Sequence, residues 1–294
     1  MKYGLVLEGG ALRGLFTAGV IDVLMENGID FDGAVGVSAG ACFGCNYKSR
    51  QPGRAIRYNT RFCRDKRYCS VRSLLTTGDL FGADFCYHKI PEELDLFDFK
   101  TFTNDPMEFF AVCTDIETGK PVYHRCRDAG YSDLEWIRAS ASMPLAARIV
   151  CHEGRKLLDG GISDSIPLRF MEATGYEKNV VILTRPRSYT KSHSRTEKLI
   201  ALRYKKYPAL VKACINRPDV YNRQLKYVGE AEAAGRAFVI APETALPISH
   251  IEHDQDVLLE VYRTGRTAGR NCLEDLRKFL GCTSEDPDPN GNNL

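Results

Sequence analysis

The order of hydrophobic and polar residues predicts that the chain begins with a β-α-β unit. Residues 3–8 and 31–37 are short apolar runs, which are typical of strands buried in a parallel sheet. Between them, residues 15–25 place apolar side chains at helical spacing, and Asn27-Gly28 is a typical C-terminal stop signal. We therefore expect two parallel strands joined by a right-handed helical crossover.

Alternating strand and helix patterns continue along the chain. Further strands are expected at residues 108–115, 121–124, 148–152, 155–158, 179–184 and 236–241. Helices are expected at residues 39–48, 52–63, 133–142 and 167–174, and an amphipathic helix or helix pair at 254–280. We expect Ser132 to cap the helix at 133–142, and the 254–280 helix to be interrupted near Gly265 and Gly269. Residues 64–105 are irregular, and we interpret them as a helical excursion over one edge of the sheet. This order predicts an α/β fold with a mainly parallel sheet.

The second strand runs directly into Gly36-x-Ser38-x-Gly40, which is the signature of a nucleophile elbow. The two glycines lack a Cβ, so the chain can turn sharply and a substrate can approach the Ser38 hydroxyl. A Gly/Ser-rich turn is the simpler interpretation, but the flanking strand and helix favour a nucleophile. Cys42 and Cys45 follow the elbow without an obvious base beside them, and we expect both to pack as small apolar groups.

The loop after the first strand allows two interpretations. Gly9-x-Ala11-x-x-Gly14 is a degraded dinucleotide fingerprint, but its middle glycine is missing and the candidate acids Asp30 and Asp32 precede the second strand. The alternative is an oxyanion hole, because loops after sequential parallel strands emerge at the same edge of the sheet. The amides of Gly10 and Ala11 would then point toward the space above Ser38. The whole candidate loop comprises Gly9, Gly10, Ala11, Leu12, Arg13 and Gly14.

Asp159-Gly160-Gly161 ends the predicted strand at 155–158 and supplies a candidate base. An aspartate at a strand end is most often a turn residue. Beside the other two motifs, Asp159 becomes the candidate that removes the Ser38 proton. A Ser–His–Asp triad stays open as an alternative, and it would recruit His193, His250 or His253.

Taken together, these segments resemble the patatin-like phospholipase family, and within it the bacterial lipid acyl hydrolases. The family pattern is G-G-G-x-K/R-G, then G-x-S-x-G, then D-G-A/G, and it corresponds here to residues 9–14, 36–40 and 159–161. The resemblance implies a Ser–Asp dyad without histidine on a three-layer α/β/α fold related to the α/β-hydrolases. Ala11 replaces the usual third glycine. Alanine fits there if its φ is negative, so we expect a local adjustment and not loss of the hole.

Composition limits the remaining possibilities. The chain has 294 residues, 44% of them hydrophobic, and a net charge of +2, as in ordinary globular proteins. We see no export signal and no apolar run long enough to span a membrane. The eleven cysteines lack zinc-type spacing, so we expect reduced thiols in a cytoplasmic protein. No metal-binding pattern is present, and we expect neither a metal nor a cofactor.

Residues 185–227 differ in character from the rest. They contain two acidic residues and twelve basic ones, interleaved with tyrosines: Arg185, Arg187, Lys191, Arg195, Lys198, Arg203, Lys205, Lys206, Lys212, Arg217, Arg223 and Lys226. A solvated helical face is the simplest interpretation. The alternative that agrees with a lipid enzyme is peripheral contact with an anionic membrane, at the inner face, and we expect no nucleic acid partner. The division expected is a catalytic domain at 1–184, a mostly helical region at 185–282 and a disordered tail at 283–294.

The function expected is hydrolysis of carboxylic esters of lipids, of the phospholipase A or esterase type, through an acyl-enzyme on Ser38. An acyltransferase or a thioesterase could use the same dyad. A non-catalytic module that binds membranes or nucleotides is the alternative from another class.

Overall fold

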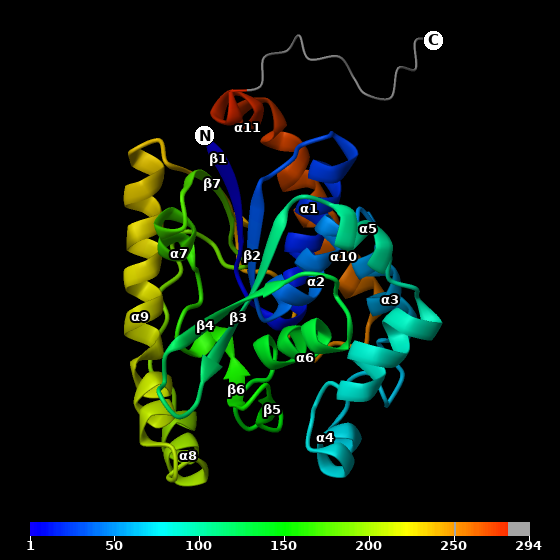
Figure 1. The fold of residues 1–294 in the computed structure, drawn as a ribbon, viewed down its shortest axis with the longest axis vertical. Helices are drawn as coiled ribbons and strands as arrows, with labels where there is room; N and C mark the ends of the chain where they lie inside the picture. The colour runs from blue at the N-terminus through cyan, green and yellow to red at the C-terminus, as the bar shows by residue number, and fades with distance from the viewer. Residues whose placement is uncertain (250, 282–294) are drawn as a thin grey trace.

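The computed structural model describes residues 1–249 and 251–281, and its core is an eight-stranded mixed sheet (Figure 1). The strand order is β5-β6-β3-β2-β1-β7-β8, with β4 paired to the other edge of β3. β1, β2, β3, β7 and β8 are parallel to one another, whereas β4 and β6 are antiparallel to β3. The bounds are β1 (Lys2–Leu7), β2 (Gly33–Val37), β3 (Glu108–Asp115), β4 (Pro121–Cys126), β5 (Val150–His152), β6 (Arg155–Asp159), β7 (Tyr176–Ile182) and β8 (Ala237–Ile240).

Helices cover both faces of this sheet, which gives the three layers expected. The α-helices are α1 (Gly14–Glu26), α2 (Ala39–Lys48), α3 (Arg54–Phe62), α4 (Val71–Thr77), α5 (Phe99–Asn104), α6 (Tyr131–Ser140), α7 (Leu168–Ala173), α8 (Thr196–Arg203), α9 (Pro208–Ala233), α10 (Gln255–Asn271) and α11 (Leu273–Leu280). The other helical elements are two short 3-10 helices, η1 (Ala11–Arg13) and η3 (Gly160–Ile162), and a π-helix, η2 (Phe85–Leu94). In Figure 1, α1, α2 and α10 lie on one side of the strands, and α7 and α9 on the other.

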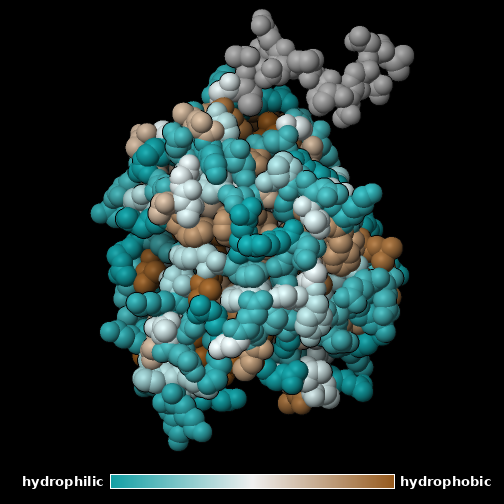
Figure 2. All heavy atoms as spheres, viewed as in Figure 1, coloured by the Kyte–Doolittle hydropathy of each residue, from teal (hydrophilic) through white to brown (hydrophobic). Residues whose placement is uncertain are grey.

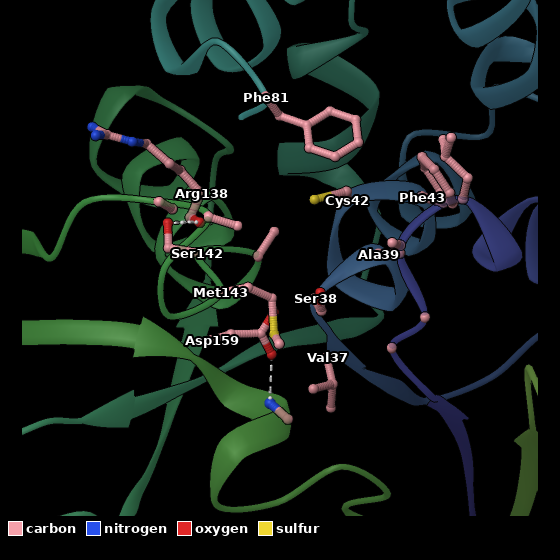
Figure 3. A pocket seen from close by; sticks show the side chains of 18 of the residues that line it. Val37, Ser38, Ala39, Cys42, Phe43, Phe81, Arg138, Ser142, Met143 and Asp159 are labelled. Carbon is pink, nitrogen blue, oxygen red and sulfur yellow. Dashed lines mark hydrogen bonds between the residues drawn. The ribbon is translucent and has the colours of Figure 1, made fainter. Parts of the chain in front are cut away.

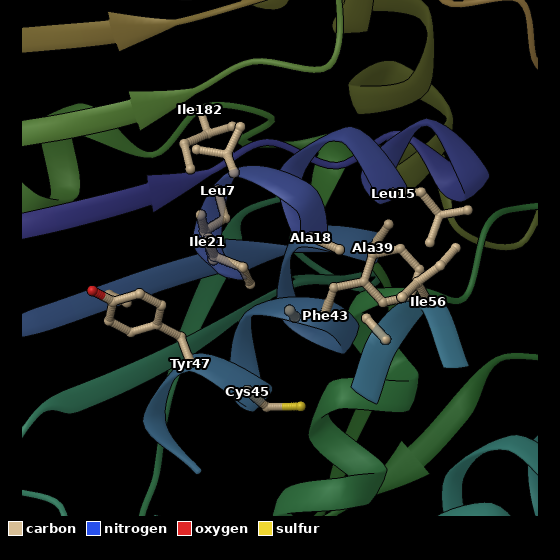
Figure 4. Packing of buried hydrophobic residues seen from close by; sticks show 14 of the residues in the cluster. Leu7, Leu15, Ala18, Ile21, Ala39, Phe43, Cys45, Tyr47, Ile56 and Ile182 are labelled. Atoms are coloured by element: carbon tan, nitrogen blue, oxygen red, sulfur yellow. The ribbon is translucent and has the colours of Figure 1, made fainter. Parts of the chain in front are cut away.

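The two faces of the sheet belong to two separate cores. Leu5 and Leu7 of β1 join the cluster formed with α1 and α2, whereas Val6 joins the cluster on the side of α7 and α9. Figure 4 shows the first cluster, with Leu7 and Ile182 from the strands packed against helical residues such as Ile21. Because successive side chains of a strand point to opposite faces, an unbroken apolar run fits a sheet covered on both sides.

The register places β2 and β6 end to end along one edge of β3. β2 pairs with β3 from Gly33↔Glu108 to Val37↔Val112, and β6 pairs from Asp159↔Cys113 to Leu157↔Asp115. β4 spans both stretches of β3, so it occupies the opposite edge. The carboxyl ends of β2 and β6 therefore meet at neighbouring positions of the same edge.

Two local predictions are wrong. Ser132 does not cap a helix, because α6 already begins at Tyr131 and the Ser132 hydroxyl bonds His152 and Glu153. α10 is not interrupted at its glycines, since it continues to Asn271 and the break follows at Cys272. A Cβ on Gly265 would lie 2.0 Å from the Phe16 carbonyl oxygen, so this glycine permits close packing against α1.

The region at 64–105 contains α4, η2 and α5, in agreement with the helical excursion expected, and β8 is the late strand expected at 236–241. The tail at 283–294 lies outside the described residues. Within residues 1–249 and 251–281, none of the helices combines the length and apolarity needed to cross a membrane.

Candidate active site

Ser38 sits on a sharp turn between β2 and α2, in the conformation that a nucleophile elbow requires. Its φ is 55° and its ψ is −122°, an unfavourable backbone region for a residue with a side chain. A Cβ on Gly36 would lie 2.5 Å from the Ala41 nitrogen, and one on Gly40 would lie 2.3 Å from the Leu7 carbonyl oxygen. Both glycines of the motif are thus needed for the turn to form.

The glycine loop after β1 lies against this turn. A Cβ on Gly9 would meet the Ser38 Cβ at 2.9 Å, so the loop and the elbow are in direct contact. Among the described residues, the backbone N–H groups of Gly10 and Ala11 donate to no protein acceptor. Ala11 has a φ of 49°, not the negative φ expected, so the turn holds alanine in the left-handed region at a cost of about 1–2 kcal/mol.

Asp159 ends β6 and faces the space beside Ser38 (Figure 3). A Cβ on Gly160 would lie 2.1 Å from the Val112 carbonyl oxygen, so only glycine allows the chain to leave β6 at this point. Asp159 Oδ1 accepts the Gly161 N–H at 2.7 Å. Its other oxygen, Oδ2, is buried and has no hydrogen-bond partner among the described residues.

The surroundings of Asp159 favour a base stronger than an ordinary aspartate. The residue is 1% exposed, and this burial raises the pKa of its carboxyl. The charge of Arg217 lowers that pKa, as do the Ser38 hydroxyl and the Gly161 N–H, but burial prevails. A carboxylate that is costly to keep ionised gains more from taking a proton.

A cavity of about 600 Å³ opens above Ser38 and Asp159 and has two unlike sides. One side is apolar and is supplied by α3, η2 and the segments that flank η2: Tyr58, Leu80, Phe81, Tyr87, Ile90 and Phe97. The other side is cationic and is supplied by the glycine loop, the segment after β7 and α9: Arg13, Arg185, Lys191 and Arg217.

Three residues that hold the site together were not singled out from the sequence. Ser140 Oγ accepts the Ser38 N–H at 2.9 Å, and Arg217 Nε donates to the Gly161 carbonyl at 2.6 Å. Glu8, at the end of β1, is 3% exposed and accepts the Tyr221 hydroxyl at 2.7 Å. The basic pattern pointed to the region of Arg217, but nothing local distinguished this arginine from its neighbours.

Those alternative residues that the structure describes are not brought to this cavity. His193 bonds the Glu197 carboxylate at 3.0 Å, His253 contacts the Cys63 carbonyl, and neither lines the cavity. His250 lies outside the described residues. Asp30 and Asp32 precede β2, at the end of the strand away from the glycine loop.

The two cysteines after the elbow pack as expected. Both line the cavity; the Cys42 Sγ lies 3.6 Å from the Tyr87 hydroxyl, and Cys45 is also part of the buried core. Burial raises the pKa of the Cys42 thiol to about 12 and that of Cys45 to about 11. Both are therefore held as thiols, which are poor nucleophiles.

One cluster away from the cavity combines metal-ligating atoms, namely His124, Cys126 and Asp133. Its members already have partners, since His124 Nε2 lies 2.8 Å from Asp133 Oδ1, and Asp133 Oδ2 accepts three backbone N–H groups. Burial also raises the pKa of the Cys126 thiol, which keeps it protonated. The cluster serves to fix the turn before α6.

The sequence profile of the patatin-like phospholipases matches residues 5–171, which include the elbow, the glycine loop and Asp159. The chain belongs to the patatin-like phospholipase family. A second profile, of the domain of unknown function DUF6363, matches residues 207–281.

Individual proteins are also similar to this chain. The chain is 29% identical to the uncharacterized protein YjjU of Escherichia coli K12, over 95% of this chain and 79% of that protein. It is 34% identical over 190 residues to the lysophospholipase nte1 of Aspergillus terreus, and the same value is found for nte1 of Aspergillus fumigatus. Those matches cover 58% of this chain but only 11% of the fungal proteins. Among solved structures, VipD of Legionella pneumophila is similar with a TM-score of 0.45 and 13% identity, over 93% of this chain and 67% of that chain.

Proposed function

We propose that this protein hydrolyses carboxylic esters of lipids, with Ser38 as the nucleophile and Asp159 as the base. The observation that carries the proposal is the meeting of β2 and β6 along one edge of β3, which puts Ser38 and Asp159 at the same point of the sheet. Membership in the patatin-like phospholipase family agrees with this chemistry.

In the reaction proposed, Ser38 Oγ attacks the ester carbonyl carbon while its proton passes to Asp159 Oδ2. The amides of Gly10 and Ala11 hold the oxyanion, and each well-placed donor contributes about 3–4 kcal/mol. The leaving alcohol takes the proton from Asp159 as the acyl-enzyme forms. Asp159 then removes a proton from water as the water oxygen attacks the acyl carbon. When the bond from that carbon to Ser38 Oγ breaks, the proton passes from Asp159 to Oγ, which releases the fatty acid and restores Ser38. The Ser38 hydroxyl lies close enough to Asp159 to lower the pKa of its carboxyl, but it forms no hydrogen bond with Oδ2 in this structure. Such contacts commonly tighten when substrate binds.

Detection of the acyl-enzyme tests this mechanism. After exposure to a short-chain ester and an acid quench, mass spectrometry should find the acyl group on the peptide that contains Ser38. A protein that turns over the ester without an adduct on Ser38, or that carries the acyl group on another residue, would refute the assignment. A non-catalytic module would show neither turnover nor adduct. Addition of an alcohol or thiol acceptor separates hydrolysis from acyl transfer by its products.

We further propose that the protein meets its substrate at an anionic membrane surface. α4 and α8 lie at the same lower end of the molecule, and hydrophobic spheres reach the surface at the tip of α4 (Figures 1 and 2). Leu75 of α4 is 81% exposed and Leu202 of α8 is 70% exposed. Exposed basic residues accompany Leu202, with Lys198 and Arg203 within α8 and Lys205 just after it. Exposed leucines next to basic side chains are typical of a helix that lies on the surface of an anionic bilayer.

Sedimentation with vesicles tests this contact. Binding to vesicles of phosphatidylcholine with phosphatidylglycerol should weaken with added salt, because the attraction between exposed charges is screened. The double variant Leu75→Ser with Leu202→Ser should bind less at every salt concentration. Equal binding by this variant would rule out the surface formed by α4 and α8.

A further inference from the structure

The cationic side of the cavity holds more positive charge than the protein neutralises. Arg13, Arg185, Lys191 and Arg217 all line it, and among the ion pairs formed by residues 1–249 and 251–281 none involves these four. The other cations of the cavity wall are paired, since Arg54 contacts Asp95 at 3.2 Å and Arg138 contacts Glu135 at 2.8 Å. The excess charge is thus confined to one side.

Three of the four cations are held in place by aromatic rings or backbone groups, and one of these three, Arg217, donates its Nε–H to the Gly161 carbonyl. The Lys191 ammonium lies 4.9 Å from the centre of the Tyr221 ring, and the Arg185 guanidinium 4.5 Å from that of Tyr189. These two rings contact each other edge to face, with centroids 5.9 Å apart. Two hydrogen bonds with Asn222, through the backbone N–H and carbonyl of Lys191, fix its backbone. The arrangement is therefore built into the fold and is not a set of mobile surface side chains.

The carboxylates nearby do not satisfy this charge. Glu8 already accepts hydrogen bonds from the Tyr221 hydroxyl and the Thr184 N–H, and Asp159 is the base proposed above. Arg13 has a buried Nε with no acceptor among the described residues. Mutual repulsion is visible in the pKa of Lys191, which burial and then the charges of Arg217, Arg13 and Arg185 lower to about 8, against the opposing effect of Glu8. Cations brought together at such a cost are typical of a binding site for an anion.

We propose that Arg13, Arg185, Lys191 and Arg217 form a subsite for the phosphate of a lipid ester. The subsite lies in the same cavity as Ser38, and the apolar side of that cavity takes the acyl chain. The substrate class is then an ester with one aliphatic chain and a phosphate near the scissile carbonyl, as in a monoacyl glycerol phosphate. This inference rests on the proposed function for the orientation of the ester, but not for the binding of the anion.

Binding to a protein that cannot turn over substrate tests the subsite by itself. In the Ser38→Ala background, calorimetry would compare octyl phosphate with octyl glucoside, which has the same chain and no charge. The double variant Lys191→Gln with Arg185→Gln should bind octyl phosphate at least about tenfold more weakly, since charged hydrogen bonds are worth about 1.5–3 kcal/mol each. Its affinity for octyl glucoside should not change.

A matched control variant removes the same number of positive charges as the cavity variant, but outside the cavity. The double variant Arg223→Gln with Lys226→Gln removes two exposed cations of α9 that do not line the cavity, and it should bind both probes as before. Equal affinity of the cavity variant and this control for octyl phosphate would overturn the proposal. Inorganic phosphate should compete only at far higher concentration, and competition at the concentration of octyl phosphate would show a site for free phosphate and overturn the lipid assignment.

Kinetics then connect the subsite to the reaction. In the active protein, the ratio of kcat/KM for monooctanoyl glycerol phosphate to that for monooctanoyl glycerol should fall at least about tenfold in the cavity variant. If neither ester is hydrolysed while octyl phosphate binding still depends on Lys191 and Arg185, the subsite stands and the proposed function falls. If both esters are hydrolysed at an unchanged ratio, the subsite is refuted and the proposed function stands.

Discussion

The two sides of the Ser38 cavity come from different parts of the chain and offer opposite environments. The apolar side is supplied mainly by the excursion between α2 and β3, with Leu80 and Phe81 after α4 and Ile90 in η2. The cationic side is supplied mainly by the chain after β7, with Lys191 before α8 and Arg217 within α9. An aliphatic chain would gain from the first side and an anion from the second, so in the function proposed the two sides together orient an amphiphile across Ser38.

The largest effect is expected where the two sides meet. Asp159→Asn should lower kcat/KM by about 10³-fold, because the base is lost, and it should do so equally for neutral and anionic esters. Steady-state kinetics on both esters would measure this. Asp164→Asn is the matched control, since Asp164 is also buried but bonds Tyr123 and Gln224 away from the cavity. A loss confined to one class of ester would show that Asp159 acts in the recognition of that ester and not as the base for both.

The apolar side should determine acyl-chain length. Phe81→Ala removes part of the surface that an acyl chain would cover, and each buried methylene is worth about 0.8 kcal/mol. The ratio of kcat/KM for dodecanoyl to butanoyl esters should fall about tenfold, while the preference for an anionic headgroup is unchanged. Phe238→Ala provides the control, because Phe238 packs against Phe279, away from the cavity. An unchanged chain-length preference in Phe81→Ala would contradict this division of roles.

The smallest effect expected is a pH dependence limited to anionic substrates. Lys191 has a pKa of about 8 and faces Arg13, Arg185, Arg217 and Glu8, so it loses its charge as the pH rises through that value. The KM for a monoacyl glycerol phosphate should rise about fivefold from about pH 7 to about pH 9.5, whereas that of the monoacyl glycerol should stay constant. Lys191→Arg should abolish this rise, because arginine stays protonated. A rise of equal size for the neutral ester would assign the titration to another group.

At acidic pH both substrates should behave alike. Burial raises the pKa of Asp159, and the base works only when ionised, so kcat/KM should fall for both esters as the pH drops through this raised pKa. In the pH profile, the loss of activity at acidic pH is therefore assigned to Asp159, and the rise of KM for the anionic ester at alkaline pH to Lys191.

Local patterns predicted the core strands and the motif residues because each of these features depends on residues that are close together in the sequence. The apolar runs of β1 and β2 and the glycines around Ser38 are each required by contacts within a few residues or with the next strand. The approach of Asp159 to Ser38 is different, because it depends on β6 pairing with β3 over a long separation in sequence. No local pattern predicts that approach, and it became an expectation only from the presence of all three motifs in one chain and from the resemblance to a family.

The remaining differences also have physical reasons. Gly265 was interpreted as a helix breaker from its low helix propensity, but its contact with α1 outweighs that cost. Among the twelve basic residues of 185–227, the three that line the cavity share the same local composition as the nine that face solvent. The path of α9 and of the loop after β7 decides which of these basic residues point into the cavity. That path depends on tertiary packing, so it cannot be predicted from a short stretch of sequence.

The structure of a covalent adduct tests the account most directly. A long-chain alkyl fluorophosphonate should react with Ser38, and a crystal structure of the product should show the phosphoryl oxygen accepting hydrogen bonds from the Gly10 and Ala11 amides. Asp159 Oδ2 should lie beside the modified oxygen, and the alkyl chain should run along Phe81. A reagent bound to another residue, or a phosphoryl oxygen turned away from the glycine loop, would contradict the site described here.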